Sequence, residues 1–120
     1  MGYVNFETPQ ELIPTVKEVL IMSSDTGKVK KGANEATKAI ERGTAKLIVI
    51  AKDVSPEEIV VHLPVLCDEK DVAYVFFPTK EELGQAIGLK VGTTAVAVIE
   101  PGNADTLLRD VVEKVKALKK

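Results

Sequence analysis

The chain has 120 residues, 45% of them hydrophobic and 28% charged, which predicts one soluble globular domain over residues 1–120. Its single cysteine excludes an internal disulfide, no apolar run could span a membrane, and no secretory signal opens the sequence, so we expect a cytoplasmic protein. Taken alone, the net charge of −2 argues against a nucleic-acid-binding protein, because such domains are often basic overall.

The first predicted element is an amphipathic helix, because apolar residues between positions 12 and 20 recur on one helical face. We expect Thr8 to cap this helix just before Pro9. Pro14 suits a first turn better than a helix interior, so the helix could also start there. Residues 25–27 are expected to end the helix in a turn.

Turn residues and hydrophobic spacing divide the rest of the chain into alternating strands and helices. We expect an extended segment at 28–31, a helix at 32–42 closed by Gly43, a strand at 47–50, a helix from Ser55 that Pro64 breaks, and a short helix at 65–70. A strand at 72–77, a helix at 79–87 capped by Thr79, a strand at 94–99 and a helix at 104–118 follow. This order predicts an α/β fold, a three-layer α/β/α sandwich around a small, mostly four-stranded central sheet. The last two residues are expected to fray.

One stretch of the chain departs from the overall negative charge. Residues 28–52 contain seven Lys or Arg residues and two Glu residues, a net charge of +5 that leaves −7 for the remainder. This segment could be a chance cluster of cations on a solvated surface. It could also contact phosphates, because affinity for nucleic acid depends on where the cations lie and not only on the net charge.

The predicted helix after Gly32 carries a mixed polar stripe. At about 100° per residue, the side chains that share this stripe are Asn34, Glu35, Lys38 and Arg42. A glycine at a helix start permits close approach, and the free first-turn N–H groups attract phosphate. The carboxylate of Glu35 would repel a phosphate but could accept a hydrogen bond from a base edge, so it suits base recognition. The deep, narrow major groove of regular A-form RNA excludes a helix, so an RNA target would have to be distorted. Alternatively, Asn34 caps the helix and Glu35 pairs with Lys38 on an ordinary solvated face.

Motifs for catalysis or cofactor binding are scarce in this sequence. His62 and Cys67, the single histidine and the single cysteine, lie in the apolar stretch HLPVLC and are expected to be core residues. A catalytic Cys–His pair is the alternative. No nucleotide-binding fingerprint occurs, and these two residues are too few for a metal site. We therefore expect no enzyme, no cofactor and no metal.

Three stretches resemble a known family. They are KGANEATK at 31–38, HLPVLCDEK at 62–70 and LGQA at 83–86. Through them the sequence resembles the archaeal large-subunit ribosomal protein L7Ae family, over about residues 6 to 118. The resemblance implies an α/β/α sandwich that binds kink-turn RNA, a bent element in which tandem sheared G·A pairs adjoin a three-nucleotide bulge.

The resemblance also implies roles for individual residues. Asn34, Glu35 and Lys38 would contact the guanines of the G·A pairs, with Lys31 and Gly32 along the RNA backbone. Leu89, Lys90 and Val91 would close over the bulged nucleotides, and Ile59 and Lys80 would lie near the flipped-out base. Together with Arg42 these are the predicted RNA-binding residues. Ser55 stands where several relatives carry an acid beside the pocket for the flipped-out base, so the resemblance does not indicate which bulged base is preferred.

By resemblance, the partners are ribosomal RNA, box C/D and H/ACA guide RNA, ribonuclease P RNA and the partner proteins of guide-RNA particles. We expect a monomer that shifts RNA toward the kinked form. Two alternatives belong to other classes. One is a protein-interaction scaffold with secondary, non-specific RNA contact, and the other is a small hydrolase that uses Cys67 and His62.

Overall fold

The computed structural model describes residues 3–4 and 8–118, and a four-stranded mixed sheet lies at its centre. The strands are β1 (Lys28–Lys31), β2 (Leu47–Ala51), β3 (Tyr74–Phe77) and β4 (Ala95–Glu100), in the spatial order β1-β4-β2-β3. β2 pairs parallel with β3, whereas β1 and β2 both pair antiparallel with β4. Every residue of β2 is buried, as expected for a β-branched strand that is covered on both faces.

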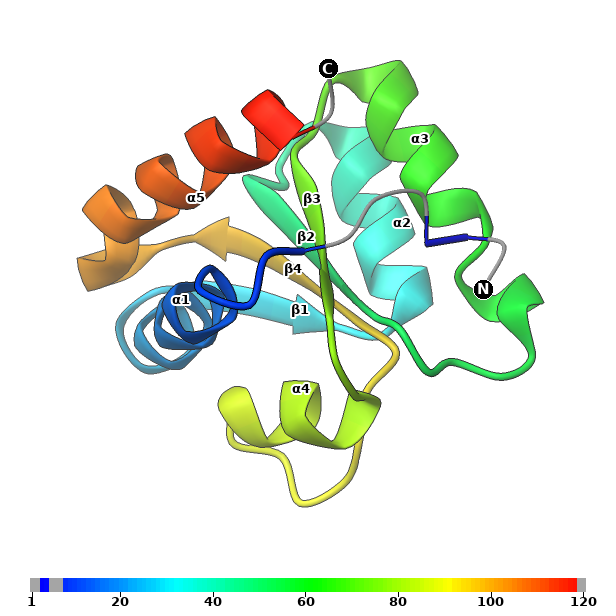
Figure 1. Cartoon of the computed structure of the whole chain (residues 1–120), viewed down its shortest axis with the longest axis horizontal. Helices are drawn as coiled ribbons and strands as arrows, with labels where there is room; N and C mark the ends of the chain where they lie inside the picture. Colours follow the sequence, from blue (N-terminus) through cyan, green and yellow to red (C-terminus); the bar gives the residue numbers. More distant parts are fainter. Residues whose placement is uncertain (1–2, 5–7, 119–120) are drawn as a thin grey trace.

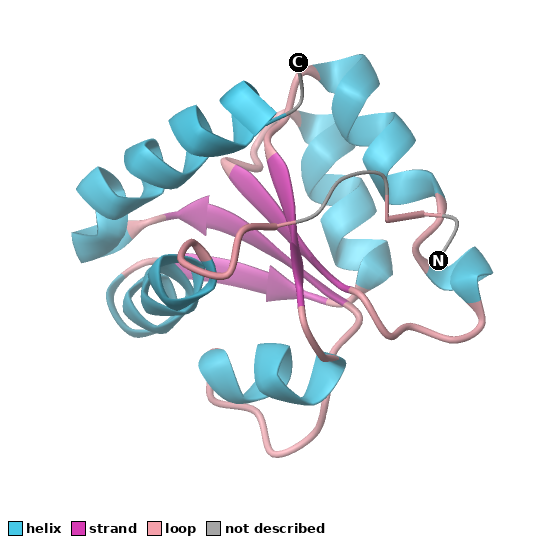
Figure 2. Ribbon diagram, viewed as in Figure 1, coloured by secondary structure: helices cyan, strands magenta, loops and turns pink. Residues whose placement is uncertain are grey.

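Within the described residues, five α-helices cover the sheet (Figures 1 and 2). They are α1 (Ile13–Thr26), α2 (Ala33–Arg42), α3 (His62–Lys70), α4 (Lys80–Ala86) and α5 (Asp105–Leu118), with short 3₁₀ turns at Glu57–Ile59 and Gly102–Ala104. α2 and α3 pack together on one face, and α1, α4 and α5 lie on the other. The predicted three-layer α/β/α sandwich with a four-stranded sheet is therefore confirmed. The two terminal lysines that were expected to fray, and position 6, where the resemblance begins, lie outside the described residues.

The topology brings several loops to one end of the sheet. Because β1, β2 and β3 run in one direction and β4 in the other, the first three end where β4 begins. The start of α2, the segment 52–59, the start of α4 and the loop 88–94 all lie there. We call this region the loop end of the sheet.

The start of α1 differs from the first expectation. The helix begins at Ile13 with Pro14 in its first turn, as the alternative allowed, and Thr8 does not cap it. The hydroxyl of Thr8 instead accepts the backbone N–H of Phe76 at 3.1 Å, next to the edge strand β3. Proline is tolerated in a first turn because the N–H it lacks would have no intrahelical acceptor.

The region after β2 also differs from the expectation. A single 3₁₀ turn at Glu57–Ile59 replaces the helix predicted from Ser55, and no side chain caps that turn. α3 then begins at His62, earlier than the predicted start at 65, and includes Pro64. Pro64 is the third residue of the helix, where its missing N–H again costs no hydrogen bond, so it does not break the helix.

Tyr3 makes the stability of the fold sensitive to alkaline pH. Burial of its hydroxyl, helped by the nearby carboxylates of Asp53 and Glu57, raises the pKa of Tyr3 above 10.0, although the N–H of Val54 acts in the opposite direction. The folded chain therefore keeps this proton at a pH where the unfolded chain loses it. The resulting stability is complete below the unfolded pKa and is lost as the pH rises through the folded one.

We expect the urea unfolding free energy to fall as the pH rises above about 10, the pKa of an unfolded tyrosine, and to fall less in Tyr3→Phe than in the wild type. Parallel pH profiles for the two proteins would contradict this role of Tyr3.

Candidate nucleic-acid interface

The polar stripe of α2 faces outward and begins at the loop end. Asn34, Lys38 and Arg42 are exposed and Glu35 is half-buried, whereas the residues on the other side of the helix are buried. Asn34 makes no side-chain hydrogen bond within the described part of the chain, so the alternative in which it caps the helix receives no support. Its amide is free to donate and to accept on a base edge.

Gly32 sets the geometry of the helix start. It has φ +94° and ψ 154°, a conformation that favours glycine, and a Cβ there would have no atom within 4 Å. Its N–H donates to the carbonyl of Ala95 at 2.8 Å, so this N–H is occupied by β4. The N–H groups that remain for an anion are those of the following first turn, from Ala33 to Glu35.

Glu35 and Lys38 form the expected i,i+3 pair, but loosely. The Lys38 Nζ lies 3.5 Å from the Glu35 Oε2, and the side chains are 53% and 43% exposed. An exposed pair of this kind contributes at most a few tenths of a kcal/mol, roughly 0.2–0.5. The pair is therefore weak enough for an RNA base to replace it.

A groove of about 660 Å³, called here the polar groove, brings part of the stripe together with residues from distant parts of the sequence. Its walls are Lys31, Gly32, Ala33, Asn34, Glu35, Glu58, Ile59, His62 and Thr94. Five of the predicted RNA-binding residues share this groove. The other four walls are Ala33, which adjoins Asn34 in sequence, and three residues that sequence reasoning missed, Glu58, His62 and Thr94. No sequence signal marked them, because only tertiary packing places them beside Asn34.

His62 belongs to this groove rather than to the core, so the expectation that it is buried was wrong. Its Nε2 lies 2.7 Å from the hydroxyl of Thr37, and the residue is exposed. The Thr37 hydroxyl donates to the carbonyl of Ala33 at 2.8 Å, so it accepts from a protonated Nε2 of His62. Cys67 is buried as expected, which removes the accessible thiolate that the hydrolase alternative requires.

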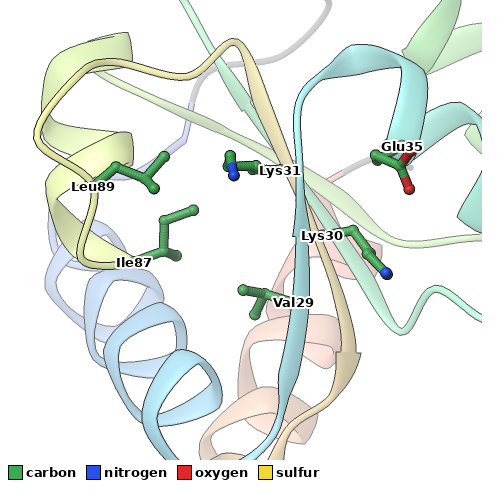
Figure 3. A pocket seen from close by; sticks show the side chains of 6 residues that line it. All are labelled: Val29, Lys30, Lys31, Glu35, Ile87 and Leu89. Carbon is green, nitrogen blue, oxygen red and sulfur yellow. The ribbon is translucent and has the colours of Figure 1, made fainter.

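A second groove of about 610 Å³ lies between β1 and the loop after α4, and we call it the β1 groove (Figure 3). Its walls are Val29, Lys30, Lys31, Glu35, Ile87 and Leu89. In Figure 3 the side chains of Val29, Lys31, Ile87 and Leu89 lie on one side of β1, while Lys30 and Glu35 lie on the other. Lys31 and Glu35 line both grooves, so the two hollows adjoin at these residues.

Most of the basic segment gathers beside these grooves. A smaller hollow of about 210 Å³ is lined by Lys28, Lys30, Glu35, Lys38, Ala39, Arg42, Thr44 and Ile99. β1 and α2 thus present four cations around one carboxylate, which is an arrangement that attracts phosphates while Glu35 stays available for a base.

The loop 88–94 brings the remaining predicted residues to the same end of the sheet. The N–H of Leu89 donates to the carbonyl of Gly84 at 2.9 Å, which holds the loop against α4. Leu89 is half-buried, whereas Val91 is 71% exposed and Lys90 is exposed. Lys80, Lys90, Val91 and Ser55 line none of the three hollows described above.

The described residues contain neither a cluster of metal-ligating side chains nor a helix that could span a membrane. Within 3–4 and 8–118, no cluster of three or more His, Cys, Asp or Glu side chains is placed to hold a metal ion. Over the same residues, no helix has the length and apolar character needed to cross a membrane.

Comparison with known proteins supports this description. A family model described as ribosomal protein L7Ae/L30e/S12e/Gadd45 family matches residues 14–108. Among solved structures, the chain is similar to the 15.5kD RNA binding protein of Giardia lamblia, at 35% sequence identity and a TM-score of 0.90, over 98% of this chain and 97% of that one. The resemblance to the L7Ae family is therefore confirmed, and so is the fold that it implied.

Proposed function

The chain belongs to the ribosomal protein L7Ae/L30e/S12e/Gadd45 family, and from this premise we propose that it is a ribosomal-type RNA-binding protein that recognises and stabilises kink-turn RNA. The observation that carries the proposal is the polar groove, where the free amide of Asn34 and the carboxylate of Glu35 lie beside the exposed Ile59. Such a groove offers hydrogen-bonding groups for the edges of G·A pairs and an apolar contact for an unstacked base.

The distribution of charge orients the RNA on this surface. Glu35 and Glu58 both line the polar groove and would repel a phosphate placed there. The lysines of β1 and the cations of α2 lie at the neighbouring hollows and would neutralise the backbone instead. Bases therefore enter the polar groove and phosphates pass over β1. A regular A-form helix, with its deep and narrow major groove, does not fit this arrangement.

The mechanism that follows is a population shift. Free RNA exchanges between bent and straight forms, and the protein binds the bent form because only that form presents the G·A edges to Asn34 and Glu35. Leu89, Lys90 and Val91 would then close over the bulge. No catalytic step is needed, so we infer a binding role rather than an enzymatic one.

The clients proposed for the protein are those of the family resemblance. They are ribosomal RNA of the archaeal large subunit, box C/D and H/ACA guide RNA, and ribonuclease P RNA, each in the cytoplasm with partner proteins of the particle. Support comes from the family match and from the solved Giardia lamblia protein, which is described as RNA-binding. We propose that the protein acts on these RNAs as a monomer.

The test is a titration of the pure protein against a kink-turn RNA and against the same RNA with both G·A pairs replaced by G·C, at one salt concentration. We expect tight binding to the first and much weaker binding to the second. Equal binding would leave only a basic surface and would favour the scaffold alternative. The observation that favours that alternative is the exposure of Val61, just before α3, and of Val65 on α3, at 43% and 60%.

Lys30 is expected to contribute to affinity through phosphate alone. Lys30→Ala should make the slope of log K against log salt shallower by about 0.7 to 0.9, with little change in the preference for G·A pairs. The measurement is a salt titration on both RNAs. Lys70→Ala, which removes a cation from the far end of α3, is the matched control and should leave the slope unchanged. A lost G·A preference in Lys30→Ala would contradict a backbone-only role.

A further inference from the structure

A series of hydrogen bonds connects the N-terminal segment to the loop end of the sheet. Tyr3 is 2% exposed, and its hydroxyl donates to the carbonyl of Ala51 at 2.7 Å and accepts the N–H of Val54 at 3.1 Å. One side chain therefore bridges the end of β2 and the segment that follows it. Because the hydroxyl is buried, losing it would leave two backbone groups without a partner.

Asp53 continues this series toward α4. It lies between the two residues that Tyr3 holds, and its Oδ1 accepts the backbone N–H of Lys80 at 2.8 Å. The carbonyl of Lys80 accepts the N–H of Thr93 at 3.0 Å. The backbone of Lys80 is thus held on both sides, by the segment after β2 and by the loop 88–94.

The contact between Lys80 and the loop is close as well as hydrogen-bonded. A Cβ on Gly92 would lie 3.1 Å from both the Cγ and the carbonyl oxygen of Lys80. The loop backbone therefore packs against the stem of the lysine, and any shift of Lys80 moves the loop that carries Leu89, Lys90 and Val91.

We propose that Tyr3 and Asp53 are positioning residues of the RNA interface. They hold the Lys80 backbone, and through Thr93 the loop 88–94, in the binding arrangement before RNA arrives. This inference rests on the proposed function, because Lys80 and the loop are the groups that would meet the bulge. Preorganisation of this kind lowers the ordering cost of binding. It also explains why a carboxylate stands at a surface that binds phosphates, since Asp53 uses its oxygen on a backbone N–H.

The first arm of the test uses Asp53 variants against the kink-turn RNA. Asp53→Ala should weaken binding by about tenfold, the size of one lost charge-assisted hydrogen bond. Asp53→Asn keeps an oxygen acceptor and should bind nearly as the wild type does. Lys80→Ala should have a smaller effect in the Asp53→Ala background than alone, because Asp53 acts through Lys80. Asp110→Ala on α5, which lies away from the loop end, is the charge-matched control and should bind normally.

The second arm needs no RNA. In hydrogen exchange of the free protein, the amides of Lys80 and Thr93 should exchange faster in Tyr3→Phe and in Asp53→Ala than in the wild type. The amide of Gly32, bonded to Ala95 at the same end of the sheet, should keep its wild-type rate and so reports on global unfolding. Faster exchange at all three amides would show a general loss of stability and would overturn the positioning role.

The two arms separate the possible failures. If the wild type does not prefer the kink-turn to its G·C counterpart, the proposed function fails, and the exchange arm alone decides whether Tyr3 and Asp53 hold Lys80 and the loop. If the wild type does prefer the kink-turn, then additive effects of Asp53→Ala and Lys80→Ala, or unchanged exchange at Lys80 and Thr93, would overturn the inference.

Discussion

Asn34→Ala is expected to weaken binding to kink-turn RNA by about 1–3 kcal/mol, which is roughly 5- to 150-fold, without weakening the fold. The amide of Asn34 is exposed, lines the polar groove and makes no side-chain hydrogen bond within the described residues. Nothing in the free protein therefore depends on it. Alanine also has the higher helix propensity, so the unfolding free energy should stay the same or rise slightly.

The measurement for Asn34→Ala is a pair of titrations, one on the kink-turn RNA and one on its G·C counterpart, together with thermal unfolding. The loss should appear on the first RNA and be nearly absent on the second, because the second offers no sheared G·A edge. Asn103→Ala removes an exposed asparagine near the opposite end of the sheet and serves as the matched control. Equal losses on both RNAs would show that Asn34 reads no base.

Local patterns predicted the parts of this fold that depend on residues close in sequence. The helix after Gly32 has its buried face opposite its polar stripe because the 3.6-residue period applies within one helix. The cap at Thr79 is confirmed, since its hydroxyl accepts the N–H of Glu82 at 3.1 Å. Capping of this kind is a short-range interaction, so the sequence carries the whole signal.

The predictions for Thr8 and His62 were wrong because they depend on contacts between distant parts of the chain. Thr8 had the composition of a helix cap, but its hydroxyl pairs with Phe76 on an edge strand that no local pattern connects to it. His62 sits in an apolar stretch, and its exposure follows from how α3 packs beside α2 and meets Thr37. In each case a tertiary contact outweighed a local preference.

The candidate site also combines features that local sequence predicts with features that only tertiary packing determines. The stripe on α2 could be read from spacing, and the family resemblance supplied Ile59, Lys80 and the loop residues. Neither source identified Glu58 and Thr94 as walls of the polar groove or Val29 and Ile87 as walls of the β1 groove. Which side chains from separate elements share a hollow depends on strand order, because that order decides which elements meet at the same end of the sheet.

Gly84→Ala is expected to displace the loop 88–94 and to reduce RNA binding more than it reduces stability. A Cβ at Gly84 would collide with the carbonyl oxygen of Val91 and would lie 3.1 Å from the Cα of Gly92. Both are backbone atoms, so no side-chain rotation relieves the overlap and the loop itself must move. Overpacking of this kind costs about 1–3 kcal/mol, partly offset by the helix propensity gained on replacing glycine.

Gly43→Ala is the matched control for Gly84→Ala. Gly43 ends α2 with φ +73° and has open space around a Cβ, so alanine there should cost about 1–2 kcal/mol through backbone strain alone. At a temperature where both variants are folded, kink-turn affinity should fall in Gly84→Ala and stay near wild type in Gly43→Ala. Hydrogen exchange at the Leu89 amide should rise only in Gly84→Ala, since that amide donates to the carbonyl of Gly84. If the two variants bound RNA equally well, the loop would make no contribution to recognition, and the interface would shrink to α2, β1 and the polar groove.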